Sequence, residues 1–232
     1  MNRIAIITAR GGSKRIPRKN IKMFCGKPII TYSIEAALQS GAFDRVMVST
    51  DDPEIAQVAL EAGAEVPFMR SAENSNDYAA TADVLLEVLN SYAEVGVDVD
   101  QFCCIYPTAP FVTAEKLSEG MKHLAENDVD TVLPVVQYSF PPQRSFSIVE
   151  DRIKMNMPNK FLCRSQDLPP IYHDCGQFYC AKTEPFKKYK LLVTPNTMPI
   201  IMPETEVQDI DTEDDWIIAE MKYKMMQERI RS

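Results

Sequence analysis

The chain has 232 residues, of which 45% are hydrophobic and 25% charged, and its formal net charge at pH 7 is −8. This composition is typical of a globular protein and excludes a disordered chain, a coiled coil or a collagen-like repeat. The acidic balance argues against binding to nucleic acid or to a membrane surface, and we expect neither a membrane span nor a signal peptide.

Short apolar runs alternate along the chain with amphipathic stretches of helical length. In chain order, the pattern predicts a strand at 4–8, a helix at 28–39, a strand at 45–50, a helix at 53–61, a strand at 65–69, a helix at 78–93, a strand at 102–106, a helix at 114–125, strands at 131–136, 176–181, 198–202 and 206–210, and a helix at 212–231. This alternation predicts an α/β fold, with a mainly parallel Rossmann-like sheet covered by helices on both faces.

The alternation is interrupted between residues 137 and 175. That stretch contains five prolines, and its apolar residues follow no helical period. Because it is too long for an ordinary connection, it is predicted to be a small inserted lobe. The expected organisation is therefore a core of residues 1–136 and 176–232 with a lobe at 137–175.

The six cysteines contain no C-x-x-C pair, and two of them are adjacent in an apolar run. This usage is typical of buried, reduced thiols in a cytoplasmic protein, which is the localisation that we expect.

A cationic segment, RGGSKRIPRKN at residues 10–20, follows the first predicted strand directly. Its five cations are Arg10, Lys14, Arg15, Arg18 and Lys19. Gly11 and Gly12 allow backbone N–H groups to approach a ligand closely, while Ser13 and Asn20 add neutral donors. Because α/β proteins bind ligands at the carboxyl ends of strands, the segment is predicted to bind a polyanion such as a triphosphate. A solvated basic loop or a patch for an acidic partner is the alternative. The segment is neither a Walker A loop nor a G-x-G-x-x-G motif.

Two aspartates, Asp209 and Asp211, are separated by one residue near the end of the chain. On an extended segment they would point to the same face and repel each other unless a cation lay between them. Mg²⁺ prefers such oxygen ligands and takes others from water and phosphate. The alternative is that Asp211 helps to start the last helix while Asp209 is merely exposed. Together with a polyphosphate loop, the pair predicts phosphoryl or nucleotidyl transfer.

Polar and aromatic residues gather where the inserted segment rejoins the sheet. Arg164 and Gln166 could hydrogen-bond a carboxylate or an amide, and Tyr172 and Tyr179 could line a sugar. With only two histidines in the chain, a zinc site is not expected, and His173 is predicted to be a hydrogen-bonding pocket residue. The segment therefore predicts a polar pocket for a hydroxylated, acidic substrate. The alternative is a lobe that forms an interface, and the two roles can share residues.

Five motifs occur together in one order: ARGGSKRIPRKN at 9–20, STDD at 49–52, Arg70 ahead of Asp77, YPTAP at 106–110 and DIDTEDD at 209–215. Over nearly its whole length the chain thereby resembles the CMP-sugar synthetases of acidic nine-carbon sugars, which are the CTP:acylneuraminate cytidylyltransferases and their relatives. The segment RSQDLPPIYHDCGQFY at 164–179 is similar to the pseudaminic acid cytidylyltransferase branch. Cys180 follows it where the family is expected to have a tryptophan, so sugar specificity would differ if that tryptophan packs on the sugar.

The resemblance implies a fold of the nucleotide-diphospho-sugar transferase type. It also implies a Mg²⁺-dependent reaction in which the anomeric hydroxyl of pseudaminic acid attacks the α-phosphorus of CTP, giving CMP-pseudaminic acid and pyrophosphate. A homodimer is implied, built through the 137–175 lobe, with each lobe reaching the partner's sugar site. The product would serve glycosylation of surface structures such as flagellin.

Motif position and residue chemistry together assign the expected site. The expected catalytic residues are Arg10, Lys19, Asp209 and Asp211, and the last two are also the expected metal ligands. The expected nucleotide-binding residues are Arg10, Gly11, Gly12, Ser13, Lys19, Asn20, Arg70, Asp77 and Thr81. The expected sugar-binding residues are Tyr106, Arg164, Gln166, Tyr172, His173, Gln177 and Tyr179. The alternatives are a CMP-synthetase for N-acetylneuraminic or legionaminic acid, a D-x-D glycosyltransferase, and a non-enzymatic nucleotide-binding module.

Overall fold

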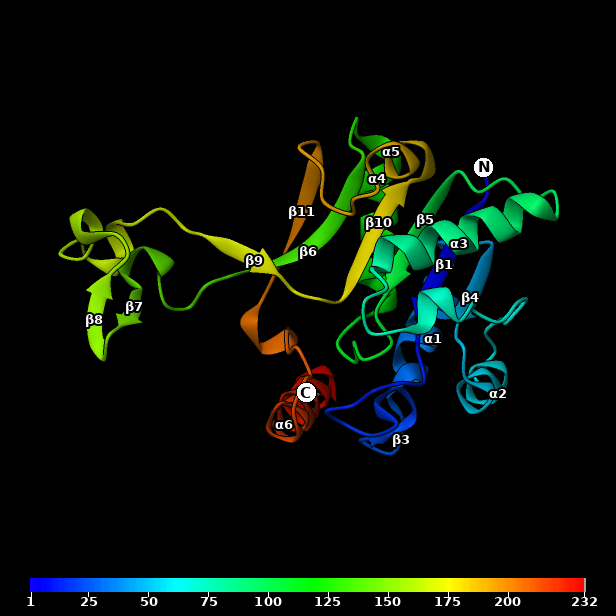
Figure 1. The fold of residues 1–232 in the computed structure, drawn as a ribbon, viewed down its shortest axis with the longest axis horizontal. Coiled ribbons are helices and arrows are strands. Elements are labelled where there is room, and N and C mark those ends of the chain that lie inside the picture. The colour runs from blue at the N-terminus through cyan, green and yellow to red at the C-terminus, as the bar shows by residue number, and fades with distance from the viewer. Residues whose placement is uncertain (232) are drawn as a thin grey trace.

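The structure, a computed structural model, describes residues 1–231 and the side chains of residues 1–229. Its central sheet has seven strands, six of them in the order β11-β6-β10-β5-β1-β4 (Figure 1). They are β1 Arg3–Thr8, β4 Arg45–Ser49, β5 Gln101–Ile105, β6 Thr131–Gln137, β9 Tyr172–Asp174, β10 Phe178–Lys182 and β11 Thr197–Met202. β1 runs parallel to β4 and β5, and β6 runs parallel to β11, whereas β10 and β9 are antiparallel to their neighbours. The predicted mainly parallel sheet is confirmed.

Helices cover both faces of this sheet, as predicted. They are α1 Ile29–Ser40, α2 Pro53–Glu61, α3 Thr81–Glu94, α4 Ala114–Glu126, α5 Thr183–Tyr189 and α6 Glu213–Arg231. Alternate residues of β1 point to opposite faces, so that Ile7 packs in one buried cluster with α1, α2 and α4, while Ile6 packs in another with α3 and α5. One apolar layer on each face of the sheet therefore holds the helices against it.

Two predicted strands are wrong. Residues 65–69 form no strand, because Pro67 has no N–H to continue a ladder, and only Glu65 makes an isolated bridge to Met47. Residues 206–210 also form none. There the carbonyl oxygens of Val207 and Ile210 accept hydrogen bonds from lysine side chains instead of from a neighbouring strand.

Several elements were not predicted. Within the core these are helix α5 and the small hairpin of β2 Met23–Phe24 and β3 Lys27–Pro28; the others are three strands between residues 146 and 174. A third buried cluster joins this hairpin to α1 and the C-terminal helix α6; its members are Ile16, Phe24, Ile29, Tyr32, Phe111, Ile210, Trp216 and Ala219. Ile16 belongs to the cationic segment and Ile210 lies between the two aspartates, and both are at most 1% exposed. Burying such a side chain stabilises the fold by about 1.5–3 kcal/mol. The cluster thus brings two distant charged motifs together.

The residues between β6 and β9 form an arm that projects from the body (Figure 1). The arm carries a hairpin of β7 Phe146–Val149 and β8 Arg152–Met155, whose eight strand residues are all exposed. Glu150 and Asp151 form its two-residue turn, both at positive φ. At the root of the arm, β9 pairs with β6 and so extends the main sheet. The strand β9 at the end of this projecting segment therefore belongs to the core sheet.

All six cysteines lie in the described part of the chain and are free thiols, and four of them are buried. Cys180 on β10 is fully buried, and a side chain added at Gly120 of α4 would meet its sulfur at 2.9 Å. Cys180 therefore faces the core, and this position, where the family is expected to have a tryptophan, does not line the cavity described below. None of the described helices is long and apolar enough to span a membrane.

Candidate active site

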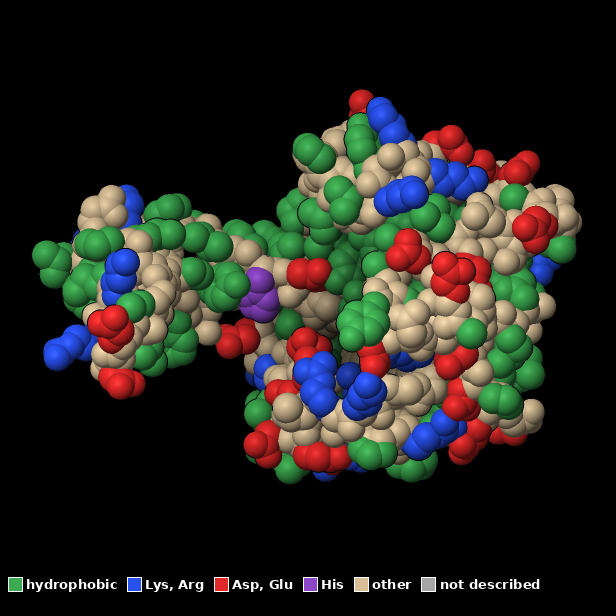
Figure 2. Space-filling view, viewed as in Figure 1, with side chains coloured by type: hydrophobic (Ala, Val, Ile, Leu, Met, Phe, Trp, Pro, Cys, Tyr) green, Lys and Arg blue, Asp and Glu red, His purple; other side chains and the backbone are tan. Residues whose placement is uncertain are grey.

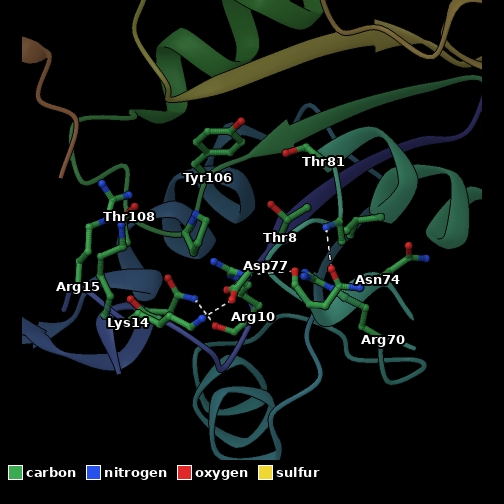
Figure 3. A pocket seen from close by; sticks show the side chains of 17 residues that line it. Thr8, Arg10, Lys14, Arg15, Arg70, Asn74, Asp77, Thr81, Tyr106 and Thr108 are labelled. Carbon is green, nitrogen blue, oxygen red and sulfur yellow. Dashed lines mark hydrogen bonds and ion pairs between the residues drawn. The ribbon is translucent and has the colours of Figure 1, made fainter. Parts of the chain in front are cut away.

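A cavity of about 680 Å³ opens at the carboxyl ends of β1 and β5 (Figure 3). It is lined by Thr8, Arg10, Ser13, Lys14, Arg15, Lys19, Asn20, Arg70, Asn74, Asn76, Asp77, Ala79, Thr81, Val84, Tyr106, Pro107 and Thr108. Five of these residues are cations and one is a carboxylate, so the cavity is strongly positive within an acidic protein. On the surface, Lys and Arg side chains gather at the lower rim of the central hollow (Figure 2). This charge favours a polyanionic ligand.

Asp77 is the carboxylate of this cavity. It accepts a hydrogen bond from Arg10 Nη1 at 3.0 Å and pairs with Lys14. The hydrogen bond from Lys14 is the main cause that lowers the pKa of Asp77. Arg10 also donates to the carbonyl oxygen of Asn76 at 3.1 Å. A polyanion in the cavity would therefore compete with Asp77 for Arg10 and Lys14.

Arg70 supplies a buried cation at the floor of the cavity, with 8% of its surface exposed. Its Nε donates to Ser49 Oγ at 3.0 Å and its Nη2 to the Ser49 carbonyl at 2.5 Å. Burial lowers the pKa of Arg70, and among the described residues no carboxylate forms an ion pair with it. A buried cation without a paired anion is costly, so the site is suited to receive negative charge.

The aspartate pair lies next to the cavity, because Asp211 contacts two cations of the cationic segment. Arg15 Nη2 lies 2.7 Å and Lys19 Nζ 3.6 Å from Asp211 Oδ1. Lys19 Nζ also donates to the carbonyl oxygen of Ile210 at 2.7 Å. Segments about 200 residues apart along the chain therefore lie side by side in the fold, although Asp209 and Asp211 do not themselves line the cavity.

The last helix does not need Asp211 as its cap. Thr212 Oγ1 accepts from the N–H of Asp215, and Asp215 Oδ2 accepts from the N–H groups of Asp211 and Thr212. These reciprocal bonds form a capping box. The side chain of Asp211 therefore does not cap the helix, and its carboxylate faces the cations Arg15 and Lys19.

Asp209 is exposed, yet its pKa is raised. The larger cause is the partial removal of its carboxylate from water, and the smaller is repulsion from Asp211. No described side chain forms an ion pair with Asp209. Among the described residues, no group of three metal-ligating side chains occurs. The protein therefore offers two hard oxygen donors, which suits Mg²⁺ if water and phosphate complete its coordination.

We predict that Asp209→Asn stabilises the protein at about pH 7. A carboxyl whose pKa is raised in the folded state makes its full contribution to stability below its unfolded-state pKa of about 3.9. That contribution is lost as the pH rises through the folded-state pKa, so at neutral pH it is absent. The Tm of Asp209→Asn should exceed that of the wild type at neutral pH, and the gain should vanish near pH 3.5. Thermal unfolding at both pH values tests this, with Asp214→Asn in the same motif as the control. A lower Tm at neutral pH would contradict it.

Of the expected sugar-binding residues, only Tyr106 lines the cavity. Tyr179 lies behind it, with ring centroids 5.5 Å apart, and donates to Asp174 Oδ2 at 2.5 Å. Gln177 is buried, and its Nε2 donates to the carbonyl oxygen of Glu206. Tyr172 and His173 lie on β9 at the root of the arm.

Arg164 and Gln166 lie on the arm, where Arg164 pairs with Asp167 and the neighbouring Ser165 accepts from Arg144. Within one chain, these two residues are not brought to the cavity.

The nucleotide-binding prediction agrees with the cavity lining for seven of its nine residues, the exceptions being Gly11 and Gly12. The N–H of Gly11 donates to Asp51 Oδ1 rather than facing a ligand. Lys14, Arg15, Asn74 and Thr108 line the cavity but were not assigned to it. Lys14 and Arg15 belong to the cationic segment and Thr108 to the YPTAP motif, so both patterns were usable signals, whereas nothing in the sequence marked Asn74.

The cytidylyltransferase family matches residues 4–192 of this chain. The chain is 39% identical to the pseudaminic acid cytidylyltransferase of Campylobacter jejuni serotype O:2, covering 98% of this chain and 99% of the relative. It is 32% identical to the CMP-N,N'-diacetyllegionaminic acid synthase of Legionella pneumophila, covering 99% of this chain and 100% of the relative.

Among solved structures, a CMP:2-keto-3-deoxy-manno-octonic acid synthetase complexed with CTP superposes with a TM-score of 0.69 at 19% identity, covering 98% of this chain and 100% of that one. A 4-diphosphocytidyl-2C-methyl-D-erythritol synthase from Anaerococcus prevotii gives a TM-score of 0.64 at 14% identity, with 96% and 98% coverage. At these identities the likeness is one of fold.

Proposed function

The chain belongs to the cytidylyltransferase family, and we propose that it joins CTP to pseudaminic acid, giving CMP-pseudaminic acid and pyrophosphate. Membership makes the protein a nucleotidyltransferase, which removes the glycosyltransferase and the non-enzymatic binding module from consideration. The observation that carries the proposal is the cavity at the ends of β1 and β5, where five cations meet one carboxylate and the aspartate pair reaches the rim.

In the proposed reaction, the anomeric oxygen of the sugar forms a bond to the α-phosphorus of CTP. The bond from that phosphorus to the bridging oxygen breaks, and pyrophosphate leaves with the electron pair while the hydroxyl proton is lost. Arg10, Lys19 and Arg70 would bind the phosphates and neutralise the charge that develops on the leaving group. Asn20 supports this role, because its Nδ2 donates to the carbonyl oxygen of Arg10 and holds the cationic segment in shape.

Asp209 and Asp211 would hold Mg²⁺, because the two carboxylates are hard oxygen donors that repel each other without a cation. Bound there, Mg²⁺ would neutralise phosphate charge. Lys19 joins this pair to the cavity, so it would keep the phosphates close to the carboxylates.

Pseudaminic acid is favoured over related sugars by the identity of the relatives. Two pseudaminic acid cytidylyltransferases from Campylobacter jejuni are 39% and 38% identical to this chain, whereas the legionaminic acid synthase is 32% identical. N-acylneuraminate cytidylyltransferases of Streptococcus agalactiae reach 32–34%. A legionaminic or N-acetylneuraminic acid substrate is the second candidate.

The decisive experiment measures pyrophosphate release from four nucleoside triphosphates combined with pseudaminic, legionaminic and N-acetylneuraminic acids. We expect release with CTP and pseudaminic acid. Release with CTP and another of the three acids would change the sugar and keep the enzyme class, while silence across the panel would defeat the proposal.

We further propose that residues 137–175 form a homodimer with a second copy and carry Arg164 and Gln166 to the partner's sugar site. The arm exposes large apolar side chains, including Phe140 at 87%, Ile148 at 79% and Leu162 at 93%. Such exposure on a projecting two-stranded hairpin supports association, because an isolated hairpin of this kind is marginally stable in water.

We predict that the double variant Ile148→Asp with Ile153→Asp is monomeric, because both side chains are more than 70% exposed and would be buried on association. Light scattering after size exclusion should show a dimer for the wild type and a monomer for the variant. Val95→Asp changes a 73% exposed side chain on the body and serves as the control. A monomeric wild type, or a variant that stays dimeric, would disprove dimerisation through the arm.

A further inference from the structure

The turn between β4 and α2, Ser49 to Asp52, contacts the cationic segment at two points outside the cavity. Near the start of that segment, the N–H of Gly11 donates to Asp51 Oδ1 at 2.9 Å. Near its end, the guanidinium of Arg18 forms two hydrogen bonds to the Asp52 carboxylate, one of them at 3.1 Å. The turn therefore holds both ends of the stretch whose side chains line the cavity.

Arg18 differs from the other cations of the segment. It is not among the cavity-lining residues, and its side chain pairs with Asp52 and Glu54 instead. Its backbone has φ 55° and ψ 31°, a left-handed conformation that is unfavourable for a residue with a Cβ. Lys19 follows directly and points to Asp211. The ion pair of Arg18 thus holds a strained residue that sets the direction of Lys19.

Asp52 is packed closely against the start of the segment. A Cβ added at Gly11 would lie 2.6 Å from Asp52 Oδ2, which leaves no room for a side chain. The Asp52 carboxylate is mostly buried and is also the N-cap of α2, where Oδ1 accepts from the N–H groups of Glu54 and Ile55. The hydrogen bond from Arg18 is the main cause that lowers its pKa, which keeps Asp52 ionised. Its position is therefore fixed from several sides.

The same turn also positions the buried cation of the cavity. Ser49 accepts two hydrogen bonds from the Arg70 guanidinium, and the N–H of Arg70 donates to the carbonyl oxygen of Thr50 at 2.8 Å. One short turn therefore contacts both the cationic segment, through Gly11 and Arg18, and the buried Arg70.

We propose that Asp52, together with Arg18, is a positioning pair that holds the cationic segment in the conformation that binds the triphosphate. Neither side chain lines the cavity, so the pair acts through the backbone at Gly11 and Lys19 rather than by touching the ligand. This inference rests on the proposed function for its kinetic consequence. The conformational consequence is independent of the substrate.

The test uses Asp52→Asn, which keeps a good N-cap for α2 but removes the charge that pairs with Arg18. We expect the KM for CTP to rise about tenfold, with the KM for the sugar within about twofold of wild type and a Tm close to that of wild type. Arg18→Gln should give the same change, and the double variant should be no worse than either single variant, because both remove one interaction. Arg18→Lys, which keeps the charge but not the fork, should recover part of the loss.

Limited trypsin digestion without nucleotide provides a second readout. Lys14 and Arg15 are exposed in this segment, and cleavage after them, mapped by mass spectrometry, should be several times faster in Asp52→Asn than in the wild type. Arg45 lies at the start of β4, the strand that leads into this turn, and forms an exposed ion pair with Glu65. Arg45→Gln breaks that pair and is the matched control, for which neither readout should change.

Unchanged KM for CTP and unchanged cleavage in Asp52→Asn would overturn the proposal. A fall in Tm with a parallel rise in both KM values would also overturn it, because it would mean a general structural role. If the wild type bound no CTP, the proposed function would fail, whereas the cleavage comparison would still decide whether the pair holds the segment.

Discussion

Replacing both Asp209 and Asp211 by asparagine is expected to lower turnover by roughly a thousandfold or more while the fold is retained. The two carboxylates would supply the protein's ligands to the divalent cation, and Asp211 also orients Lys19 and Arg15 at the edge of the cavity. Their loss would remove the charge stabilisation that the divalent cation gives the phosphates, and Arg15 and Lys19 would lose the carboxylate that orients them. Pyrophosphate release under saturating CTP and sugar measures the effect.

Two controls accompany this double variant. Asp214→Asn changes an exposed carboxylate in the same motif and should keep wild-type turnover. Thermal unfolding with and without added Mg²⁺ gives a readout independent of activity: the ion should raise the Tm of the wild type but not of the double variant. Retained turnover in the double variant, or an equal response of both proteins to Mg²⁺, would count against the metal assignment.

Arg70→Gln is expected to raise the KM for CTP by about 100-fold, the second large effect. The wild-type guanidinium is buried, is oriented by Ser49 and has no ion-paired carboxylate among the described residues. A glutamine can keep a hydrogen bond to Ser49 but supplies no charge to the triphosphate. The change should also weaken the salt dependence of CTP binding, measured by calorimetry at two ionic strengths.

Arg70→Lys separates charge from geometry in this experiment. It keeps the positive charge but loses the planar fork that bonds Ser49 at two points, so an intermediate KM is expected. Arg45→Gln on β4 removes an exposed arginine that pairs with Glu65 and should leave the KM unchanged. A wild-type KM in Arg70→Gln would place the triphosphate away from this cation.

Most of the fold was predictable because apolar periodicity reports directly on burial. Helix α2, for example, has the predicted bounds of 53–61, since a proline at its start and a glycine beyond its end mark both. The failures have local causes. Pro67 interrupts a run that otherwise reads as a strand, and the two-residue strands around Cys25 and Gly26 are too short to show a period.

The two charged motifs of the site were also predictable, because clustered cations after a first strand and alternating aspartates carry their chemistry in their residue types. The direction of each side chain was not. Arg18 and Lys19 are adjacent cations, yet one pairs with Asp52 behind the segment and the other reaches Asp211. The opposite directions of these two side chains depend on the left-handed backbone of Arg18, and nothing in the residue types predicts that conformation.

The α/β class, the cationic segment, the aspartate pair and the resemblance to one enzyme family can all be recognised in the amino-acid sequence alone. Tertiary contacts determine which cations share a cavity with Arg70 and how the cationic segment meets Asp211. The cationic segment and the aspartate pair meet because each contains an apolar residue, Ile16 and Ile210, that is buried in the same cluster. Hydrophobic burial therefore brings the charges together. The charges of the two motifs indicate what kind of ligand binds, whereas the packing of distant apolar residues places those charges in one site.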